Sequence, residues 1–204
     1  PYTTLFRSVS GIRRCGKSTL FRLFKDELLS EGVKPEQIIS INFEELEYEH
    51  LREYHALYQY ILERMQPDEM NYIFLDEIQH VDQFHRVVDS LFVKENTDLY
   101  ITGSNAYFMS SDIATLLTGR YVEIQMLPLS FSEFYHSKYD GNQYSLIPAY
   151  ESYLRESSFP YTQQLGGEDF DIQEYLRGLY NTLLLHDVVA RLKISDVTIL
   201  QDIV

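Results

Sequence analysis

Apolar residues recur along the first two thirds of the chain with two different periods. Spacings of three and four predict amphipathic helices at residues 17–30, 51–65 and 84–93. Short apolar runs typical of strands lie at residues 37–43, 71–76, 98–103 and 121–126. Tyr72 to Leu75 are continuously apolar, as expected of a strand buried on both faces of a parallel sheet. Strands that alternate with helices predict an α/β fold with a mainly parallel sheet.

The last third of the chain is predicted to be mainly helical. Ser130-Phe-Ser-Glu133 has the spacing of a capping box, which opens a helix. Residues 138–145 are polar and suggest a boundary, and helical periodicity returns at residues 148–155 and 172–192. We therefore expect a core of residues 9–138, followed by a helical linker and the truncated start of a further domain at residues 139–204.

The first eight residues, Pro1 to Ser8, match the translation of a sequencing adapter, because the DNA string CCC TAC ACG ACG CTC TTC CGA TCT encodes them. We expect residues 1–8 to be an artefact, although Leu5 and Phe6 would suit a natural strand. A strand here would bury the charge of Arg7, which is costly without a partner. Because the other end stops within an apolar, periodic stretch, we expect a fragment cut at both ends.

Composition narrows the possible classes of protein. The 204 residues are 45% hydrophobic and 24% charged, which is enough to bury a core. One cysteine excludes an internal disulfide and a cysteine-rich zinc site. No apolar run approaches the roughly 20 residues of a membrane-spanning helix, so we expect a cytoplasmic protein without a membrane partner. The net charge of −14 argues against non-specific DNA binding by this portion, because proteins that hold a nucleic-acid backbone usually have a basic patch.

One glycine-rich motif carries the candidate chemistry. Residues 11–19 fit the phosphate-loop pattern G-x-x-x-x-G-K-[ST] in full. In such a loop the backbone amides face phosphates, Lys17 reaches the β- and γ-oxygens, and Ser18 can ligate Mg²⁺. The helix that follows adds its positive N-terminal end. The predicted nucleotide site consists of Gly11, Ile12, Arg13, Arg14, Cys15, Gly16, Lys17, Ser18 and Thr19.

The strand at residues 71–76 supplies the second half of this site. Its apolar run ends in two acids, Asp76 and Glu77, which is the Walker B pattern. We expect Asp76 to hold Mg²⁺, commonly through water, and Glu77 to act as the general base on the attacking water. The alternative is an acidic strand end that leads into a solvated turn, and the phosphate-loop motif before it favours the functional interpretation.

Two further places are weaker candidates. The strand at residues 98–103 is followed by Ser104 and Asn105, either of which could act as a sensor of the γ-phosphate or its water, although Gly-Ser-Asn also makes a good turn. Arg120 could offset charge on the transferred phosphoryl group in its own chain or in a neighbouring subunit. The neighbouring-subunit case implies a homo-oligomer, and the alternative is a structural arginine.

Together these motifs resemble a bacterial and archaeal family of AAA-type ATPases with an uncharacterised C-terminal domain. The resemblance rests on the phosphate loop, Phe-Leu-Asp-Glu-Ile-Gln79, Ile-Thr-Gly-Ser-Asn105, Leu-Thr-Gly-Arg-Tyr121 and Leu-Pro-Leu-Ser-Phe-Ser-Glu133. It implies a P-loop core of the RecA/AAA type, with five strands in the order 5-1-4-3-2, and ATP as the nucleotide. It also implies that residues 175–189 open the C-terminal domain.

The sequence thus predicts an enzyme that hydrolyses ATP with Mg²⁺ to change the conformation of its C-terminal domain or of a partner. A nucleotide-gated switch with negligible turnover is the main alternative, and the presence of Glu77 favours hydrolysis. A P-loop kinase of a small molecule is less favoured, because the adjacent acids suit activation of water. A GTPase is least favoured, because the guanine-reading motif Asn-Lys-x-Asp does not occur.

Overall fold

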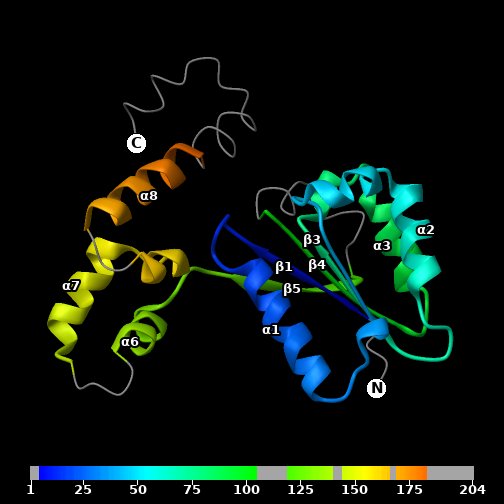
Figure 1. Ribbon diagram of the computed structural model, residues 1–204, viewed down its shortest axis with the longest axis horizontal. Coiled ribbons are helices and arrows are strands. Elements are labelled where there is room, and N and C mark those ends of the chain that lie inside the picture. Colours follow the sequence, from blue (N-terminus) through cyan, green and yellow to red (C-terminus); the bar gives the residue numbers. More distant parts are fainter. Residues whose placement is uncertain (1–4, 105–118, 140–143, 166–168, 183–204) are drawn as a thin grey trace. The chain divides into compact units, whose positions relative to one another are not determined.

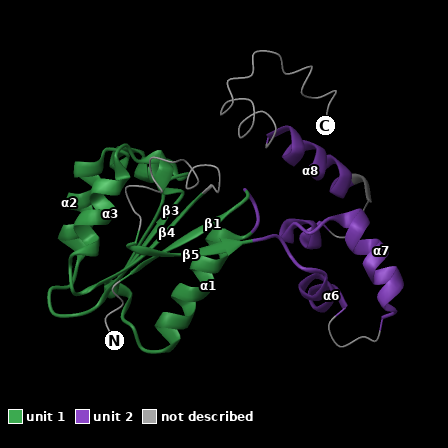
Figure 2. Ribbon diagram, turned by 180° about the vertical axis from the view of Figure 1, so that it is seen from behind, with its two compact units in different colours: residues 1–12, 16–126 green, residues 13–15, 127–204 purple. Residues whose placement is uncertain are grey.

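The chain divides into two compact units in a computed structural model that describes residues 5–104, 119–139, 144–165 and 169–182. Unit 1 comprises residues 1–12 and 16–126, and unit 2 comprises residues 13–15 and 127–204 (Figure 2). This division falls after Met126, earlier than the boundary expected after residue 138. The reason is that the helix at Phe131–Tyr139 packs within unit 2, where Lys138 forms an ion pair with Glu156.

A sheet of five parallel strands forms the centre of unit 1 (Figure 1). The strands are β1 (Phe6–Gly11), β2 (Ile38–Asn42), β3 (Asn71–Asp76), β4 (Thr97–Ser104) and β5 (Tyr121–Met126). Their spatial order is β2-β3-β4-β1-β5, and every neighbouring pair is parallel. The expected α/β fold and its order 5-1-4-3-2 are therefore confirmed. Because the strands are parallel, the carboxyl ends of β1, β3 and β4 meet at one edge of the sheet.

Helices cover both faces of this sheet. Figure 1 shows α1 (Lys17–Ser30) on one face and α2 (Tyr54–Arg64) and α3 (Phe84–Phe92) on the other. Side chains alternate between the faces of a strand. In β3, Phe74 therefore belongs to the cluster around α1, whereas Ile73 and Leu75 belong to the cluster around α2 and α3. Burial on both faces is the reason why β3 is apolar at successive positions.

Short turns lie between several of these elements. They are the 3-10 turns η1 (Pro35–Gln37), η2 (Leu46–Leu51) and η3 (Ile78–His80). The helix expected from residue 51 begins at Tyr54, because Leu51 ends η2 and Glu53 caps α2. The Glu53 carboxylate accepts a hydrogen bond of 2.9 Å from the backbone N–H of Ala56.

The described residues of unit 2 beyond Leu127 are mainly helical, as predicted for this part of the chain. Unit 2 contains α6 (Phe131–Tyr139), α7 (Leu146–Glu156), the 3-10 turn η4 (Pro160–Gln164) and α8 (Asp169–Thr182). The capping box is confirmed: the Ser130 N–H donates to Glu133 Oε2 at 2.8 Å, and the Glu133 N–H donates to Ser130 Oγ at 3.2 Å. The Ser130 backbone N–H, and then its hydroxyl, lower the pKa of the Glu133 carboxyl. No helix in the described ranges is both long and apolar enough to cross a bilayer.

The environment of Arg7 in β1 differs from the expectation of a buried charge without a partner. The Arg7 side chain is 24% exposed and forms an ion pair with Asp98 of β4. Its guanidinium carbon lies 5.2 Å from the centre of the Tyr100 ring. The Tyr100 hydroxyl donates to Asp98 Oδ2 at 2.9 Å, and its pKa is raised, first by burial and then by the Asp98 carboxylate. Residues 1–4 lie outside the described ranges, so the adapter interpretation stays a prediction.

Phe74 links the helix of the phosphate loop to the centre of the sheet. It is fully buried and stacks on Tyr100, with the ring centres 4.9 Å apart. Its ring also packs edge-on against Phe21 of α1, with the ring centres 5.2 Å apart. Phe74→Ala should lower the free energy of unfolding by about 3–5 kcal/mol, because it removes contacts and leaves a cavity. Urea denaturation measures this change. Leu46→Ala, at an exposed site, should change the free energy by less than about 0.5 kcal/mol. Equal effects of the two substitutions would contradict the assignment.

Candidate functional site

The glycine-rich loop runs from the end of β1 to the start of α1. Gly16 precedes the helix with φ 108° and ψ 12°, a conformation that favours glycine. Gly16 has no side chain, so it offers no side-chain acceptor to the amides of the first helical turn. Ser18 and Thr19 are exposed in that turn. An anion can accept hydrogen bonds from these amides and gains from the positive end of the helix.

Lys17 brings the loop and the end of β3 together. Its side chain is only 4% exposed, and its ammonium group donates to the carbonyl oxygens of Gly11 at 3.2 Å and Ile12 at 3.3 Å. The same Nζ atom lies 3.5 Å from Glu77 Oε1. A buried ammonium is tolerated only where such partners surround it. The structure therefore places the predicted phosphate-binding lysine beside the predicted general base.

Asp76 and Glu77 are buried carboxylates at the carboxyl end of β3. Glu77 has a left-handed backbone, with φ 54° and ψ 47°. This conformation costs a residue with a side chain about 1–3 kcal/mol and occurs often at functional sites. Glu77 Oε2 accepts a hydrogen bond from Gln79 Nε2, so Gln79 fixes one oxygen of this carboxylate while the other faces Lys17.

Thr102 is part of this site, although the sequence analysis did not single it out. It lies on β4 and is fully buried. Its hydroxyl donates to Asp76 Oδ1 and accepts a hydrogen bond of 2.9 Å from the Glu77 backbone N–H. The sequence contains one indication of this role: Thr102 is a polar residue within an apolar strand, and a buried polar group needs a hydrogen-bond partner.

Other predicted loop residues are distributed between surface and interior. Ile12 and Arg14 are exposed, Arg13 is partly exposed, and Cys15 is buried. Arg14 has a left-handed backbone, with φ 63°. The backbone is thus irregular around the middle of the loop, as expected of a segment whose amides face a ligand rather than a regular hydrogen-bond ladder.

The two weaker candidates have different outcomes. Ser104 ends β4 opposite Gly11, so it lies at the same sheet edge as the phosphate loop. Asn105 lies outside the described residues, and its sensor role stays a prediction. Arg120, in contrast, comes before β5, and its carbonyl accepts a hydrogen bond from the Phe6 N–H at the amino end of β1. The structure does not bring it to the other predicted residues.

The strand register explains this separation. Phe6 pairs with Tyr121, and Gly11 pairs with Met126, so the phosphate loop begins six residues further along than Arg120. Six residues of a parallel strand span about 20 Å. The Arg120 guanidinium forms an ion pair with Asp89 of α3. Of the open alternatives, a role of Arg120 toward the nucleotide of its own chain does not fit this separation, a structural role fits its contacts, and a role toward a neighbouring subunit stays a prediction.

The acids and hydroxyls of this site fit a magnesium ion that arrives with phosphates. Among the described residues, no three His, Cys, Asp or Glu side chains gather into a metal cage. Ser18 is the neighbour of Lys17 in the chain, and Asp76 is the neighbour of Glu77. Because Lys17 Nζ and Glu77 Oε1 are 3.5 Å apart, these two segments lie close together. Mg²⁺ in nucleotide sites takes only one or two protein ligands and completes its shell with phosphate oxygens and water. Asp76 and Ser18 are the residues predicted to supply such a pair.

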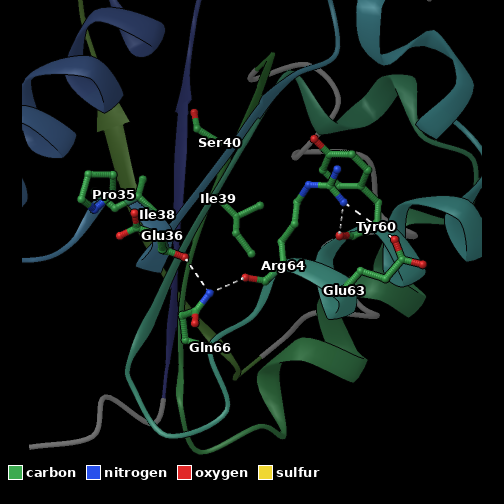
Figure 3. A pocket seen from close by; sticks show the side chains of 9 residues that line it. All are labelled: Pro35, Glu36, Ile38, Ile39, Ser40, Tyr60, Glu63, Arg64 and Gln66. Atoms are coloured by element: carbon green, nitrogen blue, oxygen red, sulfur yellow. Dashed lines mark hydrogen bonds and ion pairs between the residues drawn. The ribbon is translucent and has the colours of Figure 1, made fainter.

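A pocket of about 430 Å³ lies elsewhere, between β2 and the end of α2 (Figure 3). Its lining includes Ile38, which pairs with Tyr72 at the amino end of the strands, away from Asp76. Figure 3 shows that its polar groups bind one another: Gln66 Nε2 donates to the Arg64 carbonyl at 3.3 Å, and the Arg64 guanidinium lies over the Tyr60 ring. This pocket is separate from the loop and the acids.

Comparisons with known proteins identify what this chain is similar to. A family described as AAA domain matches residues 6–135. An uncharacterized protein of Haemophilus influenzae is 38% identical over 205 residues, covering 99% of this chain and 50% of the relative. An uncharacterized protein of Methanocaldococcus jannaschii is 30% identical, covering 93% of this chain and 43% of the relative. The chain therefore spans about half the length of the curated relatives it matches.

Two solved structures resemble this chain loosely. The structure of PCH-2 from C. elegans covers 66% of this chain and 38% of its own, with 14% identity and a TM-score of 0.46. Cdc6p from Pyrobaculum aerophilum covers 86% of this chain and 55% of its own, with 15% identity and a TM-score of 0.43. Superpositions this loose carry no functional argument.

The position of Arg120 leads to a prediction. Arg120→Ala should leave nucleotide affinity unchanged within about twofold and should lower the free energy of unfolding by no more than about 1 kcal/mol, because it removes a partly exposed ion pair. Nucleotide titration and urea denaturation measure the two quantities. A tenfold loss of affinity would contradict the placement of Arg120. A role toward a neighbouring subunit would instead appear as activity recovered on mixing Arg120→Ala with Glu77→Gln.

Proposed function

The chain belongs to the AAA domain family, and from this premise we propose that unit 1 binds ATP with Mg²⁺ and hydrolyses the ATP. Membership and fold support a nucleotide-binding protein of the ATPase type. The observation that carries the finer proposal is the 3.5 Å separation of Lys17 Nζ and Glu77 Oε1. A phosphate-binding cation and a candidate base for water are thus close together in a buried site.

Binding follows from the loop and from the start of α1. The backbone amides that follow Gly16 lie at the N-terminus of α1, where the helix dipole favours a bound anion. Lys17 would provide a positive charge for the β- and γ-phosphates. Asp76 and Ser18 would hold Mg²⁺, which would neutralise part of the negative charge of the phosphates. Lys17 would exchange its carbonyl partners for phosphate oxygens, so its desolvation is already compensated before ATP arrives.

Hydrolysis requires a base beside the terminal phosphate. Glu77 would accept a proton from water at a carboxylate oxygen while the water oxygen bonds to the γ-phosphorus. The bond between the γ-phosphorus and the β–γ bridging oxygen breaks, and ADP and phosphate result. Gln79 holds Glu77 Oε2, which leaves Oε1, the oxygen beside Lys17, directed to the phosphate end of the site. Arg120 of the same chain takes no part in this step.

A further part of the proposal concerns what the cycle of ATP binding and hydrolysis changes in the protein. Because this chain spans about half of its curated relatives, the remaining half is a candidate for the part that the cycle moves. We infer that ATP binding and hydrolysis change the conformation of the C-terminal part or of a bound partner. A differential affinity of ATP and ADP for two conformations is the physical requirement for such a coupling.

The first test concerns the buried lysine. Lys17→Ala should weaken ATP binding at least about tenfold, because charged hydrogen bonds contribute about 1.5–3 kcal/mol each. Equilibrium titration with a fluorescent ATP analogue measures the affinity. Lys25→Ala on the same helix, whose ammonium bonds to Ser40 Oγ at 2.8 Å, is the matched control and should stay within about twofold. Unchanged binding in Lys17→Ala would mean that the loop is not the nucleotide site.

The second test concerns the base. Glu77→Gln should retain ATP binding yet slow hydrolysis by about 10²-fold or more, because an amide cannot accept the proton. Release of phosphate under saturating ATP measures turnover, and Glu63→Gln on the exposed side of α2 is the control. Turnover that is equally slow in the wild type and in Glu77→Gln would favour a nucleotide-gated switch over an ATPase.

A further inference from the structure

β4 carries a buried hydroxyl that faces the end of β3. Leu75 pairs with Ile101, so the next residues along, Asp76 and Thr102, lie side by side. Both side chains point to the face that α1 covers. Side chains alternate along a strand, and Phe74 and Tyr100, two residues before Asp76 and Thr102, belong to the cluster around α1. A fully buried hydroxyl costs free energy unless its hydrogen-bonding capacity is used.

The hydroxyl of Thr102 uses its donor and its acceptor on the two Walker B residues. It gives its proton to Asp76 Oδ1, and its oxygen accepts the Glu77 backbone N–H at 2.9 Å. One atom therefore restrains the carboxylate of Asp76 and the backbone of Glu77 together. The Glu77 backbone needs such a restraint, because its left-handed conformation costs about 1–3 kcal/mol.

We propose that Thr102 is a positioning residue for the reaction proposed above, on which this inference rests. Because Oδ1 of Asp76 accepts from Thr102, Oδ2 is assigned to the metal side of the carboxylate. The bond to the Glu77 N–H holds the turn that directs the Glu77 carboxylate toward Lys17. Thr102 touches neither the nucleotide nor the water and acts through these two acids. Residues that orient metal ligands typically affect affinity or activity 10–100-fold.

Three substitutions isolate the hydroxyl. Thr102→Val keeps the shape of the side chain and removes the hydrogen bonds, whereas Thr102→Ser keeps the hydroxyl and removes the methyl group. Thr97→Val is the matched control, because Thr97 lies at the other end of β4 and its hydroxyl has no hydrogen-bond partner among the described residues. If Thr102→Val does not fold, as judged by circular dichroism, Thr102→Ala takes its place.

The first readout needs no nucleotide. Exchange of the Glu77 amide proton, followed by NMR on the free protein, should become about tenfold faster in Thr102→Val, because a hydrogen bond of about 1.4 kcal/mol is lost. Thr102→Ser and Thr97→Val should exchange like the wild type. Exchange that does not change in Thr102→Val would overturn the contact on which the inference stands.

The second readout tests the role. With a non-hydrolysable ATP analogue bound, the affinity for Mn²⁺ in place of Mg²⁺, measured by electron paramagnetic resonance, should fall about 10–100-fold in Thr102→Val. Turnover should fall by a similar factor, while analogue affinity in EDTA should stay within about twofold. Thr102→Ser should retain both properties within about threefold. Equal losses in Thr102→Ser and Thr102→Val would assign the effect to packing and overturn the inference.

The outcomes separate this inference from the proposed function. A wild-type protein that binds no ATP analogue would refute the proposed function and, with it, the role of Thr102. A wild-type protein that binds and hydrolyses ATP, together with a Thr102→Val variant that has the same turnover and Mn²⁺ affinity, would refute the role of Thr102 alone.

Discussion

The compensation of one buried positive charge is the constraint on which the site depends. Lys17 is almost fully buried, and an isolated ammonium there would cost several kcal/mol. Two loop carbonyls and the Glu77 carboxylate offset this cost, and they come from different parts of unit 1. The loop can hold Lys17 inside only because the end of β3 lies beside it. The charge thus ties the conformation of the loop to the position of the acids.

Hydrogen bonding extends this arrangement from the lysine into the sheet. Glu77 contacts Lys17 and Gln79 through its side chain and Thr102 through its backbone. Thr102 in turn contacts Asp76, so the two acids share one support on β4. Because β4 lies between β1 and β3, this support connects the strands that carry the loop and the acids. A rigid, apolar sheet therefore holds a polar site whose members restrain one another.

The aromatic cluster beneath α1 has a related role. Phe74 precedes Asp76 by two residues and packs against Phe21 and Phe24 of α1. The start of α1 is the part of the site that is proposed to bind phosphate. The packing of this helix against β3 therefore affects the positions of Lys17 and Ser18. Phe74 also stacks on Tyr100, two residues before Thr102. The same apolar contacts that stabilise unit 1 therefore align both halves of the site.

The sequence by itself determined the elements, the fold class and the two motifs. The order of the strands came from resemblance to a family and was confirmed. Periodicity alone could not supply it, because β1 lies between β4 and β5, which are not its neighbours along the chain. The motif spacing predicted Lys17, Asp76 and Glu77, which the structure brings together at one sheet edge. Tertiary structure alone decided three points. It paired Arg7 with Asp98, it paired Arg120 with Asp89, and it joined Thr102 to the acids. Each point depends on contacts between side chains that are distant in sequence. Local periodicity contains no information about such contacts.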